Sequence, residues 1–202
     1  ILIGGSRAGG KGLFALDITD PSIFTEANAS QIALWEFTFE DDPNLGYTYS
    51  KPSIVMMKNG KWAAIFGNGY NSNGTNLAGD TATGEAQLFI VYLDGGLDGS
   101  WTQGTDYLTI TTGVGDTTTP NGLSTPAVVD IDLDGVADRV YAGDLQGNLW
   151  AFDLTSSTPS IAYTDSGNPS PLFTASISGV GQPITSKPVV SFHPAPPNSH
   201  GD

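Results

Sequence analysis

The sequence predicts an all-β fold, a partial β-propeller of four-stranded antiparallel blades with about three blades present. Three observations predict it. Apolar runs rich in Val, Ile, Phe, Tyr, Trp and Thr alternate with clusters of Gly, Asn, Asp, Ser and Pro, which is the pattern of strands and turns. Helical periodicity is nearly absent. The strand motifs also return in a fixed order along the chain, as the blades of a propeller do.

The composition of the 202 residues excludes several classes of function. Acidic side chains number 21 against 7 basic ones, which gives a formal net charge of −14. That balance argues against nucleic acid and anionic membrane surfaces as partners and suits a cation. The absence of cysteine excludes disulfide scaffolds, cysteine-based metal sites and cysteine nucleophiles. Every apolar stretch is far shorter than the roughly 20 residues of a membrane-spanning helix, so we expect no span in this segment.

The first repeated element is a Ser-x-Pro sequence that opens a strand. It occurs at residues 50–52, 124–126 and 186–188, and apolar residues follow each copy. Successive copies are 74 and 62 residues apart. Compact propeller repeats have about 40–50 residues, so we expect enlarged loops, with residues 68–84 as one insertion.

Three further strands complete the repeated unit. The second strand ends in glycine and is expected at residues 1–5, 63–69 and 139–144. The third ends in aspartate and is expected at residues 12–17, 88–94 and 148–153. A looser fourth strand is expected at residues 33–39, 107–112 and 171–177. The one helical turn that we expect covers residues 21–27, where Asp20 and Pro21 can start it.

These units divide residues 1–202 as one segment of a single propeller domain. A blade without its first strand covers residues 1–40, and two full blades cover about 47–113 and 120–178. The first strand of another blade is expected at residues 186–192. Propellers close with about four to eight blades, so we expect this chain to be part of a longer one. A β-sandwich is the alternative, but it does not explain the fixed order of motifs.

One motif carries chemistry, and it lies between the first two strands of the third unit. Residues 130–138 read Asp-Ile-Asp-Leu-Asp-Gly-Val-Ala-Asp, with carboxylates at loop positions 1, 3, 5 and 9 and glycine at position 6. Alternate carboxylates in a tight loop can point to one centre, and Ca²⁺ takes about six to eight oxygen ligands. The predicted ligands are the side chains of Asp130, Asp132, Asp134 and Asp138 and the backbone carbonyl of Val136.

Two other interpretations of this loop stay open. A solvated acidic hairpin is one, although it explains the regular spacing poorly. Mg²⁺ is another, although it prefers waters and a rigid octahedron. The loop is not an EF-hand, because position 12 is Tyr141, inside a predicted strand, where an EF-hand has a bidentate glutamate.

Other candidate sites are weaker. The asparagines of residues 68–76 could offer amide oxygens to a ligand, but such an Asn- and Gly-rich stretch is far more often a flexible turn. The Gly-Gly-Lys-Gly sequence of residues 9–12 precedes a strand, so it lacks the helix N-terminus of a phosphate loop. The four tryptophans are expected to pack between blades, namely Trp35, Trp62, Trp101 and Trp150. No arrangement of catalytic residues stands out, so we predict no enzyme activity.

Three stretches of the sequence carry a family resemblance. Leu-Gly-Tyr-Thr-Tyr-Ser-Lys-Pro at residues 45–52 is followed by Gly-Lys-Trp-Ala-Ala-Ile-Phe-Gly-Asn-Gly-Tyr-Asn-Ser at 60–72. Gly-Gly-Lys-Gly-Leu-Phe-Ala-Leu-Asp occupies residues 9–17, and residues 138–153 carry Gly-Asn-Leu-Trp-Ala-Phe-Asp at their end. These stretches, which follow one another along most of the chain, resemble the C-terminal domain of the PilC/PilY-type type IV pilus biogenesis proteins.

The resemblance implies a modified β-propeller in a secreted protein at the pilus tip or outer membrane of a Gram-negative bacterium. Such proteins support pilus extension against retraction, and hence twitching motility, and some act in cell adhesion. The implied partners are pilus, minor-pilin or secretin components or a host surface. The family's calcium loop falls on Asp130, Asp132, Asp134, Val136 and Asp138, with every side-chain ligand intact.

Two rival functions share parts of the sequence pattern. A fragment of a quinoprotein, pyrroloquinoline-quinone-dependent dehydrogenase propeller has similar blade motifs. Its quinone site needs a closed ring with calcium at the axis, whereas this loop joins two strands of one blade. An integrin-type adhesin propeller uses similar aspartate loops in several blades, whereas only one occurs here.

Overall fold

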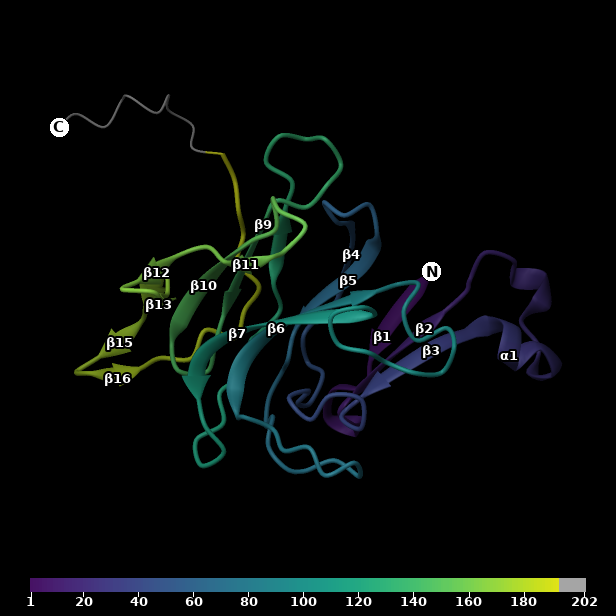
Figure 1. Ribbon diagram of the computed structural model, residues 1–202, viewed down its shortest axis with the longest axis horizontal. Helices are drawn as coiled ribbons and strands as arrows, with labels where there is room; N and C mark the ends of the chain where they lie inside the picture. The colour runs from purple at the N-terminus through teal and green to yellow at the C-terminus, as the bar shows by residue number, and fades with distance from the viewer. Residues whose placement is uncertain (193–202) are drawn as a thin grey trace.

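The computed structural model describes residues 1–192, and its main sheets lie side by side in chain order (Figure 1). The first sheet contains β1 (Leu2–Gly5), β2 (Gly12–Leu16) and β3 (Ala33–Thr38). The second contains β4 (Ser53–Met56), β5 (Trp62–Gly67), β6 (Glu85–Tyr92) and β7 (Tyr107–Gly115). The third contains β8 (Ala127–Val129), β9 (Arg139–Gly143) and β10 (Asn148–Asp153), with β11 (Ser160–Ile161) and β14 (Phe173–Thr174) beside β10. All strand pairs in these sheets are antiparallel, which confirms the all-β, partial-propeller prediction.

The expected helical turn is confirmed and continues further than the sequence indicated. It contains two 3₁₀ turns, η2 (Pro21–Ile23) and η3 (Glu26–Asn28), and then α1 (Ala29–Ile32); a third 3₁₀ turn, η1 (Arg7–Gly9), follows β1. The Asp20 carboxylate accepts a hydrogen bond from the Ser22 N–H at 2.9 Å and so caps η2. Within residues 1–192, no helix has the length and apolar character that crossing a membrane requires.

The looser fourth strand of the third unit differs from the prediction. Instead of one strand over residues 171–177, two short strands pair with opposite ends of β10, namely β11 and β14. Prolines at 159, 169 and 171 remove backbone N–H donors from this region, which prevents a continuous ladder. The remaining chain forms two small hairpins, β12 (Thr164–Asp165) with β13 (Asn168–Pro169), and β15 (Ser176–Ile177) with β16 (Val180–Gly181).

Residues 186–192, expected to start another blade, form no strand in the described part of the chain. They nevertheless lie near the third sheet. Residues 187–190 form one wall of a cavity whose other wall is β8. Just before them, the Ile184 N–H donates to the Asp144 carbonyl at 2.9 Å. Val189 is 97 % exposed.

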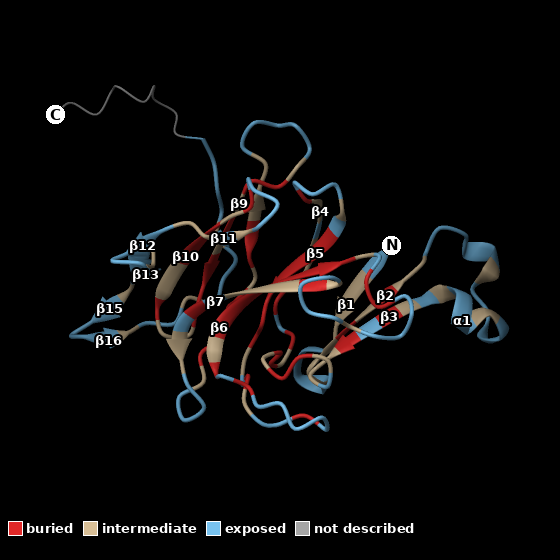
Figure 2. Ribbon diagram, viewed as in Figure 1, coloured by how far each residue is buried: buried red, intermediate tan, exposed pale blue. Residues whose placement is uncertain are grey.

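The core consists of two layers that separate the three sheets, and Figure 2 shows its buried residues along β5, β6, β9 and β10. Ile65 and Leu88 belong to the cluster that packs against Trp150 of the third sheet. Phe66 and Phe89 point the other way and join the cluster with Phe37 of the first sheet. Because side chains alternate between the two faces of a strand, both faces of the second sheet are buried. This explains why the β6 sequence is an almost unbroken apolar run.

The tryptophan prediction is only partly correct. Trp150 is fully buried and Trp35 is 6 % exposed, and both pack between sheets. Trp101 is partly buried against the same cluster as Trp35 and donates from Nε1 to the Glu36 carbonyl at 2.8 Å. Trp62 is 51 % exposed, so its expected packing between blades was wrong. It opens β5 opposite Met56 and lines an open cavity with Val136 and Ala137 of the acidic loop instead of packing into a core cluster.

Candidate metal centre

The acidic loop of residues 130–138 joins β8 to β9. It begins and ends at one strand pair, Val129 with Arg139, and the Asp138 N–H donates to the Val129 carbonyl at 2.9 Å. Two residues between these ends have left-handed backbone, Leu133 with φ 63° and Gly135 with φ 88°. Glycine adopts this conformation without the steric cost that a side chain brings, which explains its place at the turn.

The loop folds around the carboxylates of its first and last residues. Asp130 accepts from the Leu133 N–H at 2.7 Å and from the Gly135 N–H at 2.8 Å, one bond to each oxygen. At the other end, Asp138 accepts from the Ile131 N–H at 2.7 Å. These charge-assisted bonds fix both carboxylates in orientation. Asp138 is also only 9 % exposed, so the centre has one well-buried acidic side chain.

Three of the predicted ligands come together. One carboxylate oxygen each from Asp130, Asp132 and Asp138 lie within 4.8 Å of one another. Ligands on opposite sides of a Ca²⁺ ion are about 4.6–5.2 Å apart, since each Ca–O distance is about 2.3–2.6 Å. The spacing therefore fits a cation of this size. Three carboxylates this close repel one another when no cation offsets their charge.

The other two predicted ligands lie at the rim of the loop. One oxygen of Asp134 accepts from the Val136 N–H at 2.8 Å, and the other lies 3.9 Å from Lys58 Nζ. The Asp134 side chain is 41 % exposed, so it has room to turn. Val136 forms a backbone bridge with Met56. Asp134 and Val136 therefore remain predicted ligands outside the three-carboxylate group.

The loop is also a contact between neighbouring sheets. The Ala137 N–H donates to the Met56 carbonyl at 2.9 Å, and Met56 is the last residue of β4 in the second sheet. Lys58, the partner of Asp134, follows two residues later. The conformation of the acidic loop is therefore coupled to the packing of the third sheet against the second.

The asparagine stretch holds a structural residue rather than a ligand site. Asn68 is fully buried, and its side-chain oxygen accepts from the N–H groups of Gln87 at 3.1 Å and Leu123 at 2.9 Å. Its amide donates to the carbonyls of Asn44 at 3.1 Å and Glu85 at 2.9 Å. With all four bonds made, Asn68 ties the second sheet to the segment that enters the third, and it has no free oxygen for a ligand.

Asp144 is a structural carboxylate that the sequence interpretation missed. It is fully buried directly after β9. One oxygen accepts from the backbone N–H groups of Gln146 and Asn148 at 2.9 and 2.8 Å. The other accepts from the side chains of Asn121, Asn148 and Trp150 at 2.9, 3.0 and 2.8 Å. The turn sequence Asp-x-x-Gly ahead of the β10 strand is the signal that could have indicated it.

Asp42 is another buried acidic residue, and the pKa of its carboxyl is raised. Asp42 is 4 % exposed, and burial raises the pKa of its carboxyl above the ordinary value, although hydrogen bonds from Asn44 oppose this. Burial also raises the pKa of Tyr107, and the nearby Asp42 adds to that shift. Asp42 accepts from the backbone N–H and the side-chain amide of Asn44, both at 2.9 Å. These contacts close a turn and offer no nucleophile or metal ligand.

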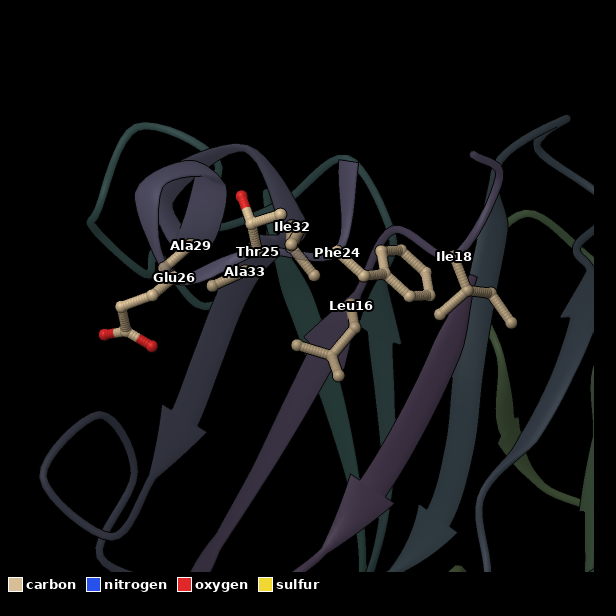
Figure 3. A pocket seen from close by; sticks show the side chains of 8 residues that line it. All are labelled: Leu16, Ile18, Phe24, Thr25, Glu26, Ala29, Ile32 and Ala33. Carbon is tan, nitrogen blue, oxygen red and sulfur yellow. The ribbon is translucent and has the colours of Figure 1, made fainter. Parts of the chain in front are cut away.

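An apolar cavity lies beside the helical insertion of the first sheet and is drawn in Figure 3. Its volume is about 390 Å³, and Leu16, Ile18, Phe24 and Ile32 contribute to its wall. Glu26 is its one charged neighbour, and Figure 3 shows the carboxylate of Glu26 pointing away from the apolar side chains. A cavity with this lining has no convergent polar groups for catalysis.

Comparison with known proteins gives a consistent family assignment. The family model described as the PilY1 beta-propeller domain matches residues 1–196. The chain is 45 % identical to a type IV pilus biogenesis factor PilY1 homolog of Xylella fastidiosa, over 96 % of this chain and 13 % of the relative. It is 41 % identical to the type IV pilus biogenesis factor PilY1 of Pseudomonas aeruginosa, over 96 % of this chain and 16 % of the relative.

A solved structure has the same fold. The crystal structure of the Pseudomonas aeruginosa PilY1 C-terminal domain matches with a TM-score of 0.72 and 38 % sequence identity. The match covers 96 % of this chain and 38 % of the solved one. This chain therefore spans less than a fifth of the length of these curated relatives and well under half of the solved domain.

Proposed function

Because this chain belongs to the PilY1 β-propeller domain family, we propose that it is a non-enzymatic, calcium-binding propeller segment of a type IV pilus biogenesis factor. The observation that carries the calcium part is the approach of Asp130, Asp132 and Asp138 to within 4.8 Å. Asp134 and the Val136 carbonyl complete the proposed ligand set. Oxygen ligands alone, most of them carboxylates, are the donor set of a hard cation.

Bound calcium supplies positive charge that offsets the repulsion between the loop carboxylates. The effect reaches the neighbouring sheet, because the same loop bonds to Met56 through Ala137. Extracellular calcium modules bind with dissociation constants of about 10⁻⁴–10⁻³ M, so millimolar calcium outside the cell would fill the site. The ordered loop would then hold the second and third sheets in one arrangement.

In the cell, we propose that this arrangement supports pilus extension against retraction, and through it twitching motility and adhesion. The names of the relatives support a role in pilus biogenesis. The proposed location is the pilus tip or the outer membrane, outside the cell. The proposed partners are pilus, minor-pilin or secretin components, or a host surface.

Calorimetry tests the calcium site. We expect calcium-dependent heat with the unaltered protein and its loss in Asp138→Asn and Asp134→Ala variants, because both changes remove a carboxylate ligand. Asp165→Asn is the matched control. Asp165 lies in the exposed β12–β13 hairpin, and this substitution changes the net charge by the same amount as the two loop variants. The calcium proposal fails if the unaltered protein gives no calcium-dependent heat or shift in melting temperature.

Counting pili tests the regulatory part separately. Bacteria carrying Asp134→Ala should show fewer extended pili and reduced twitching than bacteria carrying the Asp165→Asn control. Unchanged piliation, together with lost calcium binding, would leave calcium as a structural ligand only.

A further inference from the structure

The turn between β4 and β5 occupies the place in the second sheet that the acidic loop occupies in the third. It joins two paired strands between Met56 and Trp62, as the acidic loop joins β8 to β9. The two connections carry opposite charges. The turn reads Met-Lys-Asn-Gly-Lys over residues 57–61, whereas residues 130–138 carry four aspartates. A basic turn of one sheet therefore corresponds to the acidic loop of the next.

The backbone of this turn is fixed, and the acidic loop is bonded to its start. Met57 is buried, and its N–H donates to the Lys61 carbonyl at 2.9 Å, which closes the turn. Directly before it, the Met56 carbonyl accepts from the Ala137 N–H of the acidic loop at 2.9 Å. The backbone of Lys58 therefore has a set position beside the loop, and its side chain is the part that can move.

The two lysines of the turn have different partners. Lys61 Nζ lies 3.3 Å from a carboxylate oxygen of Asp94 and 4.8 Å from the centre of the Tyr92 ring. Lys58 Nζ lies 3.9 Å from Asp134 Oδ2, and it forms no other ion pair in the described part of the chain. Lys58 is therefore the lysine that faces the proposed calcium site, and Lys61 is held elsewhere.

Both carboxylate oxygens of Asp134 have partners at the rim of the loop. Oδ1 accepts from the Val136 N–H at 2.8 Å, and Oδ2 faces Lys58. Asp134 therefore has to turn inward before it can join the three-carboxylate group as a ligand. The ion pair with Lys58 is the contact that gives way, because exposed ion pairs are weak. Calcium favours the exchange, since it carries two charges and binds an oxygen at about 2.3–2.6 Å.

We propose that Lys58 competes with calcium for Asp134. This inference rests on the proposed calcium site and concerns the regulation of that site. Without calcium, the ammonium group of Lys58 holds Asp134 at the rim and offsets part of the repulsion among the loop carboxylates. Calcium has to displace it, so the site fills at a higher calcium concentration than the same loop would without this lysine. The competition weakens with rising ionic strength, because the two side chains are 48 % and 41 % exposed.

The exchange also changes a contact between two sheets. Lys58 belongs to the second sheet and Asp134 to the third, so calcium removes a side-chain contact between them. The backbone bond from Ala137 to Met56 does not involve either side chain and stays in place. Calcium therefore releases a lysine on the second sheet at the same time as it orders the loop of the third.

Calorimetric titration of calcium into the full-length protein, at about 0.1 M salt, tests the competition. The heat that Asp138→Asn removes is the share of the acidic loop. Lys58→Gln keeps a polar side chain and removes the charge, and we expect its loop to bind calcium about two- to five-fold more tightly, the range of an exposed ion pair. Lys61→Gln is the matched control, because it removes the same charge from the same turn but from the pair with Asp94. It should change the affinity far less.

Two further titrations show whether the charge of Lys58 is responsible. Lys58→Arg keeps the charge and should bind calcium with nearly the affinity of the unaltered protein. At about 1 M salt, where the screening length is about 3 Å, the difference between Lys58→Gln and the unaltered protein should shrink. A gain in Lys58→Arg as large as in Lys58→Gln, or a gain that salt does not reduce, would come from the shape of the turn and would overturn the proposal.

Lysine acylation gives a measurement on the unaltered protein. Calcium should raise the rate at which Lys58 is acylated relative to Lys61, as read by mass spectrometry, because Lys58 is released from its carboxylate. Calcium should leave this ratio unchanged in Asp138→Asn. If the loop binds calcium but the Lys58 rate and the affinity of Lys58→Gln are both unchanged, only the competition is refuted. If calcium gives no heat with the unaltered protein, the proposed calcium site fails, and the competition fails with it.

Discussion

Replacing Asp144 by asparagine is the most informative single change, because it alters hydrogen bonding at constant shape. Asp144 accepts five hydrogen bonds, two on one oxygen and three on the other. Asparagine keeps only one carbonyl oxygen. If that oxygen keeps the two backbone donors, its NH₂ group faces the side-chain donors of Asn121, Asn148 and Trp150. Three donors then lose their acceptor, two of them buried (Asn121 and Trp150) and one half-buried (Asn148).

The expected cost follows from this count. Each buried group left without a partner costs about 1–3 kcal/mol, so the two buried donors give about 2–6 kcal/mol, and the half-buried Asn148 amide can turn to water. Removing a buried charge offsets part of that cost. We therefore expect the free energy of unfolding to fall by about 2–4 kcal/mol. Equilibrium urea unfolding of the complete propeller domain measures the change through a lower midpoint.

Two comparisons show whether the reasoning is sound. Asp165→Asn changes the same charge at an exposed hairpin and should stay within about 0.5 kcal/mol of the unaltered protein. Trp150→Phe should cost less in the Asp144→Asn background than in the unaltered one, because the bond that it removes is already lost. A loss below about 1 kcal/mol for Asp144→Asn would refute the hydrogen-bond argument.

Three further changes test separate parts of the structure. Gly67→Ala places a methyl group 2.3 Å from the Leu123 carbonyl oxygen, so unfolding measurements should show a loss of about 1–3 kcal/mol or more, whereas Gly9→Ala, with no atom within 4 Å of the added carbon, should cost far less. Asp42 has a raised pKa, so the unfolded chain ionises first as pH rises above 3.8; the stability of the unaltered protein relative to Asp42→Asn should therefore fall with rising pH from there until folded Asp42 ionises, and a relative stability that rises would contradict the shift. Adding calcium at ten times its dissociation constant should stabilise the folded domain by about 1.4 kcal/mol, as a higher melting temperature that Asp130→Asn abolishes; equal shifts in both proteins would exclude the loop as the binding site.

The sequence alone determined the fold class. Buried strands need short runs of β-branched and aromatic residues, and turns need Gly, Asn, Asp, Ser and Pro, so the alternation of the two is visible in the sequence. The sequence predicted a strand at residues 88–94, and the structure has β6 there, over Glu85–Tyr92. That both its faces are buried, with Leu88 facing one core and Phe89 the other, came from the structure. The repeat of Ser-x-Pro and glycine-ended strands also predicted the sheet order. Local sequence is enough to predict the order of the strands, because strands that follow one another in the sequence usually lie side by side in an antiparallel sheet.

The acidic loop was predictable for a related reason. The spacing of its aspartates is local, so nine residues contain the information that brings the carboxylates of Asp130, Asp132 and Asp138 together. The ion pair of Asp134 with Lys58 was not predictable, because Lys58 lies in the turn between β4 and β5 of the second sheet, far away in the sequence. The sequence also did not predict that the outer strand of the third sheet is divided. β11 pairs with one end of β10 and β14 pairs with the other end.

Only the tertiary structure decided which polar residues are buried. Asn68 and Asp144 lie in Gly- and Asn-rich stretches that are typical of exposed turns, yet both are fully buried. Their hydrogen-bond partners include Leu123 for Asn68 and Asn121 for Asp144, which are 55 and 23 residues distant in sequence. Composition reports how polar a segment is, whereas burial depends on what packs over it. A sequence therefore determines strands and a local acidic loop, and the packing of sheets decides which side chains tie the blades together.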